Sequence, residues 1–206
     1  MSSAAEPRPA PRVRLAAAER RADLLECAGR AFAEGSYRGT TTAEIARAAG
    51  VTEPILYRHF ASKRDLYLAC LVEGWQRVRA LWERALAEEP DPALWISAMA
   101  RSWRESEHRV VGSSLWVQSF AEAGEDPEIC AFMRKHMREV HAFVADVHRR
   151  AQRAGGVLPD RDPDAEAWIF LSVGLLKMVD VRLGGLAERK TPAIASARLR
   201  WLTGRT

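Results

Sequence analysis

Apolar side chains recur every three or four positions along almost the whole chain from Ala16 onward. This spacing places them on one face of an α-helix, and no segment shows the strict apolar–polar alternation that is typical of a half-buried strand. The pattern therefore predicts an all-α fold with about nine helices. We expect the helices to span about residues 17–34, 41–50, 53–59, 63–88, 91–108, 111–123, 126–154, 162–183 and 191–203.

Short polar residues mark the starts of these helices, because their side chains can accept hydrogen bonds from the first backbone amides. Thr41 and Glu44 form a capping box before the second helix. Thr52 is positioned to cap the third helix, which has Pro54 in its first turn, and Ser62 is positioned to cap the fourth. Asp-Pro or Thr-Pro pairs open later helices at residues 91, 126, 162 and 191.

The net charge of +4 is concentrated at the N-terminal end of the chain. Residues 1–64 contain 11 Lys and Arg against 7 Asp and Glu, whereas the remaining residues contain 20 of each sign. A basic segment joined to a neutral one indicates a polyanionic partner for the basic segment. We divide the chain into a disordered basic arm (1–15), a small helical domain (16–64) and a larger helical domain (65–206).

The composition indicates a soluble protein of the reducing cytoplasm. Its 206 residues are 48% apolar and 28% charged, and three cysteines without a C-x-x-C pair argue against a disulfide scaffold or a zinc site. The longest apolar run, Ala167–Val179, contains Lys177 and is shorter than the roughly 18 residues that cross a bilayer. The proline-rich start of the chain also lacks the apolar run of a signal peptide.

Residues 41–60 predict two short helices joined by a tight turn with Gly50 at the bend, which is a helix-turn-helix arrangement. The second of these helices is too short to be stable alone, so we expect Leu56 and Phe60 to hold it against its neighbours. Its other face then carries Tyr57, Arg58 and His59, whose side chains can all donate to phosphates or base edges.

Residues 41–66 read T-T-x-x-I-A-x-x-A-G-V-T-x-x-x-L-Y-x-H-F-x-S-K-x-x-L. This motif resembles the TetR (tetracycline-repressor-like) family of bacterial transcription regulators. The resemblance covers about residues 18–75 at motif level and continues beyond them mainly as helix number and chain length. It implies a homodimer whose subunits each have a three-helix DNA-binding head and a larger helical body for ligand binding and dimerisation.

Carried over residue by residue, the resemblance puts Thr42, Tyr57, His59 and Lys63 on the phosphate backbone. It gives base readout to the tip of the recognition helix. The predicted DNA-binding set is Thr42, Thr52, Glu53, Pro54, Ile55, Tyr57, Arg58, His59 and Lys63.

Several of these residues have a structural alternative. Thr42 can simply begin a helix, while Tyr57 and His59 can serve packing alone. Glu53 can accept from a cytosine amino group, but we favour a role at the positive end of its own helix. Ile55 fits a thymine methyl group and the core equally well.

Aromatic residues in the larger domain indicate an apolar or aromatic small-molecule effector. We predict that Trp82, Met99, Trp103, Trp116 and Phe120 surround a central cavity, the alternative being that they only fill the core. The resemblance implies that a ligand bound there releases the protein from DNA.

The last two helices, about 163–203, are the predicted dimer face, because the segment from Trp168 to Val179 is apolar nearly all round. The alternative is a helix buried entirely inside one subunit.

Three histidines of the long helix at 126–154, His136, His141 and His148, lack the spacing of a metal site on one helix turn, so we expect surface histidines.

No catalytic motif stands out, so an enzyme is not expected, and the sequence gives no sign of a cofactor. The sequence therefore predicts a regulator, most simply a repressor, that binds a double-stranded DNA operator and no membrane. The alternatives are an activator, or a helical small-molecule-binding module without DNA binding.

Overall fold

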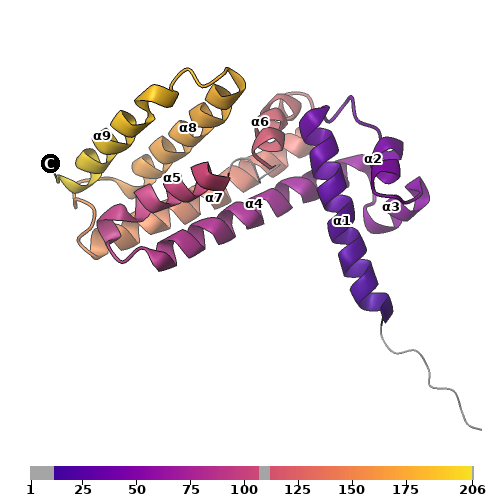
Figure 1. Ribbon diagram of the computed structural model, residues 1–206, viewed down its shortest axis with the longest axis horizontal. Coiled ribbons are helices and arrows are strands. Elements are labelled where there is room, and N and C mark those ends of the chain that lie inside the picture. Colours follow the sequence, from indigo (N-terminus) through magenta and orange to yellow (C-terminus); the bar gives the residue numbers. More distant parts are fainter. Residues whose placement is uncertain (1–11, 107–111, 206) are drawn as a thin grey trace, which may run out of the picture. The chain divides into compact units, whose positions relative to one another are not determined.

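The computed structural model describes residues 12–106 and 112–205, and in these ranges the protein consists of α-helices and two short 3₁₀ turns, with no strand (Figure 1). The predicted all-α class and the count of nine α-helices are confirmed for this part of the chain. The helices are α1 (Arg12–Glu34), α2 (Thr42–Ala48), α3 (Glu53–His59), α4 (Lys63–Glu88), α5 (Trp95–Ser106), α6 (Gly112–Ala123), α7 (Pro127–Arg153), α8 (Pro163–Arg182) and α9 (Thr191–Thr203). The 3₁₀ turns, Pro92–Leu94 and Glu188–Lys190, lead into α5 and α9.

Two compact units meet in the chain between Cys70 and Leu71. We call the described residues 12–70 the head and residues 71–205 the body. The helix α4 begins in the head and continues in the body. None of the helices in the described residues is both long and apolar enough to cross a membrane.

The helix starts follow the predicted capping chemistry in most cases. Thr41 and Glu44 form the expected capping box, and the Ser62 hydroxyl accepts from the Asp65 amide at 3.0 Å. Asp126 likewise accepts from two amides in the first turn of α7. The prediction is wrong at Thr191, which lies inside α9, where its hydroxyl donates back to a carbonyl of the preceding turn.

The helix α1 begins at Arg12, five residues before the predicted start at Ala17. No glycine or proline follows Pro11 in this stretch, so nothing in the sequence interrupts a helix there. The predicted arm thus overlaps the first turn of α1, and residues 1–11 lie outside the described part of the chain.

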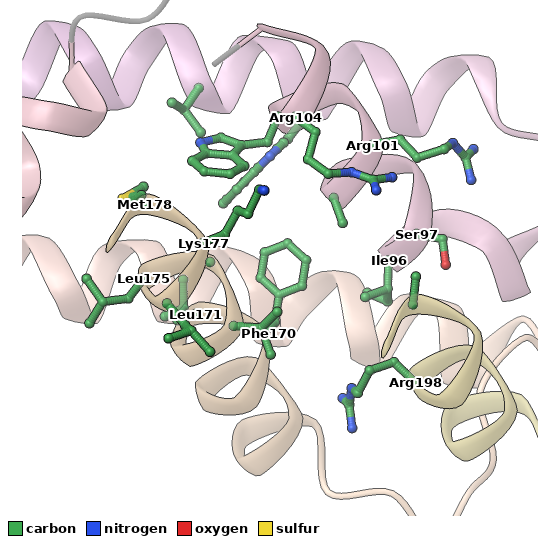
Figure 2. A pocket seen from close by; sticks show the side chains of 18 of the residues that line it. Ile96, Ser97, Arg101, Arg104, Phe170, Leu171, Leu175, Lys177, Met178 and Arg198 are labelled. Carbon is green, nitrogen blue, oxygen red and sulfur yellow. The ribbon is translucent and has the colours of Figure 1, made fainter. Parts of the chain in front are cut away.

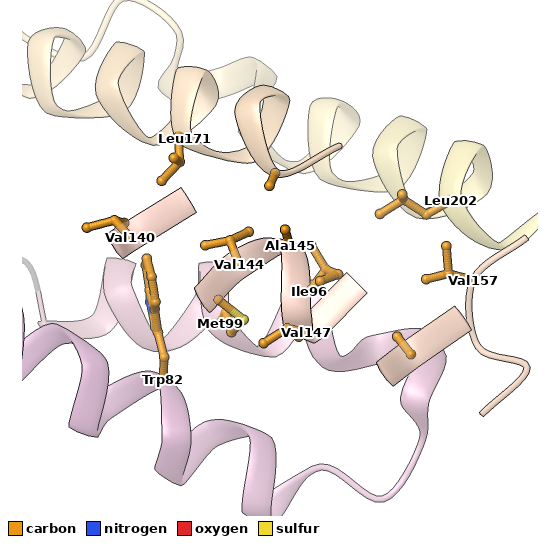
Figure 3. Close-up of a cluster of buried hydrophobic side chains, with 12 residues drawn as sticks. Trp82, Ile96, Met99, Val140, Val144, Ala145, Val147, Val157, Leu171 and Leu202 are labelled. Carbon is orange, nitrogen blue, oxygen red and sulfur yellow. The ribbon is translucent and has the colours of Figure 1, made fainter. Parts of the chain in front are cut away.

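The body is built around α7, which packs against α5, α6 and α8. Figure 3 shows the valines of α7 facing Met99 of α5 and Trp82 of α4, all within one cluster of buried apolar side chains. Leu171 of α8 and Leu202 of α9 close this cluster from the other side. The core of the body therefore joins five helices through a single apolar interior.

Two histidines of α7 are buried, so the prediction of surface histidines is wrong for them. His136 and His148 are 4% and 1% exposed. They lie four residues before Val140 and four residues after Val144, which puts them on the buried face of the helix. His148 Nδ1 donates to the Val144 carbonyl at 3.0 Å, and burial lowers the pKa of both histidines, which keeps them neutral near pH 7.

Candidate functional site

The helix-turn-helix of the head is formed as predicted. The turn between α2 and α3 passes through Gly50, whose φ of +66° lies in the left-handed region that favours glycine. Leu56 is fully buried and Phe60 is 4% exposed, so α3 is held from one side by apolar contacts. This anchoring fixes a helix of only seven residues and leaves its opposite face at the surface.

A polar cluster joins the start of α2 to α3. The Thr42 hydroxyl donates to the carboxylate of Glu53 and lies 3.2 Å from the Tyr57 hydroxyl. Thr42 itself is 7% exposed. The structure thus brings together three residues of the predicted DNA-binding set, and it ties the Glu53 carboxylate to α2 at the first turn of α3.

The outer face of α3 carries most of the remaining candidates. Tyr57 is 44% exposed and Ile55 is 37% exposed, so Ile55 is not a core residue. His59 is half-buried. Thr52 precedes α3 as expected, but its side chain makes no capping hydrogen bond, so the predicted cap is wrong. The other exposed candidates on this face are Pro54 and Arg58.

Lys63 lies at the first position of α4 and is turned toward the loop between α1 and α2. Its Nζ lies 4.9 Å from the centre of the Tyr37 ring and donates to the Arg38 carbonyl at 3.4 Å. These contacts hold the ammonium group beside the N-terminus of α4, where the helix dipole also favours an anion.

The body contains a cavity of about 480 Å³ with a mainly apolar lining drawn from the six helices α4 to α9 (Figure 2). Trp82, Trp103 and Trp116 line it, as predicted. Met99 and Phe120 do not line the cavity, so the prediction that they surround it is wrong for these two residues. Met99 is fully buried in the core cluster, and Phe120 is 38% exposed with its ring edge-to-face against Trp116 at 5.0 Å.

Sequence reasoning missed most of the lining, because the cavity draws on α8 and α9 as well as on the helices that carry the predicted ligand residues. Phe170 and Lys177 come from α8, Arg198 comes from α9 and Arg104 comes from α5. His136 of α7 also lines the cavity. We assigned α8 and α9 to dimerisation and His136 to the surface, and α5 entered the predicted cavity only through Met99 and Trp103.

The outer side of α8 is apolar and exposed. Trp168 is 46% exposed, Val173 42% and Leu176 60%. These residues recur at helical spacing, so they form one apolar face on a single subunit, and Val173 and Leu176 also border the cavity. The same helix also buries Ala167 and Leu171 in the body core, which explains why its sequence is apolar nearly all round.

Comparison with known proteins connects this geometry to a family. Residues 24–70 match the family model of bacterial regulatory proteins, tetR family. The HTH-type transcriptional regulator UidR of Escherichia coli (strain K12) is 24% identical over 170 residues, which cover 82% of this chain and 84% of that protein. A TetR-family transcriptional regulator from Rhodococcus sp. matches with a TM-score of 0.79 at 19% identity, over 90% of this chain and 99% of its own.

A second solved structure matches over a similar length. AibR, crystallised in complex with isovaleryl coenzyme A and operator DNA, gives a TM-score of 0.65 at 21% identity, over 91% of this chain and all of its own. The match of the head to this family model, together with the match of most of the chain to UidR, puts the protein in the class of DNA-binding transcription regulators. Through residues 24–70 the chain resembles the tetR family of bacterial regulatory proteins, and over most of its length it is similar to the regulators named above.

Proposed function

We propose that this protein binds a double-stranded DNA operator as a homodimer, represses transcription there, and leaves the DNA when a small molecule fills the cavity of the body. The observation that carries the proposal is the outer face of α3. Tyr57 and Arg58 are exposed on it, while Leu56 and Phe60 fix the helix from the inside. A helix held in this way can enter the major groove without rearranging.

The polar cluster at the start of α2 gives the candidates distinct roles. Thr42 positions the Tyr57 hydroxyl for a phosphate, and its bond to Glu53 keeps that carboxylate away from the DNA backbone. Lys63 and His59 add contacts to the backbone. Base contacts fall to the exposed start of α3, namely Thr52, Pro54 and Ile55, with Arg58 further along the same helix.

Fluorescence anisotropy tests DNA binding. Labelled DNA from the region upstream of the protein's own gene is titrated at about 0.15 M salt against a scrambled duplex, because backbone contacts alone are weak at that ionic strength. We expect Tyr57→Ala and Lys63→Ala each to weaken operator binding by about tenfold or more. Arg30→Ala is the matched control, since Arg30 is an exposed arginine of α1 that pairs with Glu26 outside the helix-turn-helix.

Equal and weak binding to both duplexes, unchanged in these variants, would favour the alternative of a small-molecule-binding module without DNA binding. A reporter gene under the same upstream region then separates repressor from activator. Deletion of the regulator raises expression in the first case and lowers it in the second.

The proposed dimer forms through α8 and α9, within residues 163–203. The dimer is supported by the exposed apolar face that includes Trp168, Val173 and Leu176, because burial against a symmetry mate removes such a face from water.

Light scattering after gel filtration tests the proposed dimer. We expect a dimer for the unmodified protein and a monomer for Leu176→Glu, which places a charge in the middle of the interface. A monomer in both would refute the dimer.

The cavity supports the ligand-responsive part of the proposal. Its volume of about 480 Å³ and its aromatic lining suit a small organic molecule. AibR, with a similar fold, binds isovaleryl coenzyme A as well as operator DNA. A ligand releases DNA only if it binds the DNA-free conformation more tightly, so occupancy must lower operator affinity. We assign the protein no enzymatic reaction.

A further inference from the structure

The cavity of the body is apolar but carries an excess of positive charge. Four cationic side chains lie in its lining, and the three that have an acidic partner are Arg101 with Glu89 at 3.2 Å, Lys177 with Asp180 at 3.6 Å, and Arg198 with Glu166. These pairs leave little net charge at their own positions, because each carboxylate offsets the cation beside it.

The fourth cation, Arg104, has no acidic partner among the residues that the structure describes. It is half-buried on α5, near the C-terminal end of that helix. Figure 2 shows Arg104 reaching from α5, and Lys177 reaching from α8, into the same open space. A guanidinium group with several unused donors beside an apolar chamber is suited to binding a carboxylate, sulfonate or other anion.

The rest of the lining provides a site for an apolar body. Trp103, Trp116 and Phe170 contribute aromatic surfaces, and Gly174 leaves space beside α8, where an added Cβ atom would meet no other atom within 4 Å. Aromatic and aliphatic groups of a ligand gain free energy when they leave water for such a surface.

We propose that the effector is an amphipathic organic anion, with its aromatic or aliphatic body among the cavity tryptophans and its acid group on Arg104. This inference rests on the proposed function, since it names the chemical class of ligand for the same cavity. Neutral apolar molecules of the same shape bind more weakly, because they leave Arg104 without an acceptor.

A matched pair of fluorescent probes tests the inference. The compounds are 8-anilinonaphthalene-1-sulfonate and N-phenyl-1-naphthylamine, which share one aromatic skeleton and differ in the sulfonate. Both are titrated into the full-length protein and three variants. Arg104→Gln removes the proposed anion contact, and Gly174→Leu fills the cavity. Arg84→Gln removes the same charge from an exposed arginine of α4 that does not line the cavity.

We expect the sulfonate to bind at least tenfold more tightly than the neutral probe. Arg104→Gln should remove about tenfold of that preference, while binding of the neutral probe stays unchanged. Arg84→Gln should change neither affinity by more than twofold, and Gly174→Leu should abolish the binding of both. Circular dichroism confirms that each variant remains folded.

The proposal would be overturned by equal affinity for the two probes or by the absence of sulfonate binding. It would also be overturned if Arg104→Gln and Arg84→Gln had equal effects. Sulfonate binding that survives in Gly174→Leu would also overturn it, because the anion would then lie outside the cavity. Operator binding is measured separately without probe. Loss of the probe preference with intact operator binding refutes the ligand class alone, and absent operator binding with the expected preference refutes the proposed function alone.

Discussion

The buried ion pair between α8 and α9 provides a sharp test of the structural reasoning. Glu166 lies in the first turn of α8 and is 3% exposed. Its carboxylate accepts from the guanidinium of Arg198 and, at 2.7 Å, from the Trp201 indole, both on α9. Burial alone would raise the pKa of Glu166, but Arg198 and Trp201 outweigh it, so the pKa lies below its ordinary value.

Arg198→Met should destabilise the fold by about 3 kcal/mol, because it leaves a buried carboxylate with a single neutral donor as its main partner. This is the lower end of the usual range, since the Arg198 side chain is 26% exposed and water reaches the pair. Glu166→Gln should cost less, about 1 kcal/mol, because the amide oxygen keeps the Trp201 hydrogen bond and Arg198 can turn toward solvent. The double variant should cost clearly less than the sum of the two.

The contribution of Glu166 to the free energy of unfolding should change with pH in a definite direction. In the unmodified protein the lowered pKa of Glu166 contributes stability that is present above the ordinary carboxyl pKa of 4.5 and is lost as the pH falls through the folded value. In Arg198→Met burial prevails and should raise the pKa of Glu166, so protonation then relieves the buried charge. The cost of Arg198→Met should therefore shrink between pH 7 and pH 4.

Urea unfolding followed by circular dichroism at one protein concentration measures these free energies at each pH. The Glu166→Gln background is the control, because Arg198→Met should have no comparable pH dependence there. A cost of Arg198→Met that stays constant with pH, or strict additivity in the double variant, would refute the assignment of Glu166 as a buried charge held by Arg198.

Three further substitutions test local geometry, each by its urea midpoint. Gly156→Ala should cost about 2 kcal/mol or more, because the new Cβ would lie 2.4 Å from backbone atoms of Pro92 and Ala93; a neutral result would mean that this close approach is wrong. Gly50→Ala should cost about 1 kcal/mol from its positive φ alone, since no atom lies within 4 Å, and no change would argue against the turn geometry. Thr41→Ala should cost about 1 kcal/mol by removing a helix cap, and an unchanged midpoint would count against the capping box.

The sequence was most informative where structure is decided locally. The capping box at Thr41 and the Asp126 cap depend on residues within three or four positions of each other, and both were predicted. Thr52 and Thr191 show the limit of this reasoning. Each is a suitable residue next to a proline, yet the hydroxyl of neither caps its helix, because several geometries satisfy the same local sequence.

Contacts between distant segments could not be read in this way. Glu166 and Arg198 are 32 residues apart, and nothing in either local sequence indicates that they meet. The spacing of the histidines excludes a metal site on one helix turn, but it does not show that His148 lies on the buried face of α7, which is recognisable only when the neighbouring helices are known. For the same reason the tryptophans predicted a cavity, while its charged residues on α5, α8 and α9 were found only in the structure.

The helix α8 links the two proposals about the body. Leu171 and Lys177 line the cavity, whereas Trp168 lies on the exposed apolar face of the same helix and outside the cavity lining. Leu176 belongs to both surfaces. A ligand that repositions α8 through its inner side must also alter the outer side, because a helix moves as a rigid unit. Dimerisation and ligand binding then share a coupling free energy, and linkage makes that coupling reciprocal. The variant Trp168→Glu, which places a charge on the proposed dimer face and outside the cavity lining, should therefore bind the sulfonate probe with altered affinity.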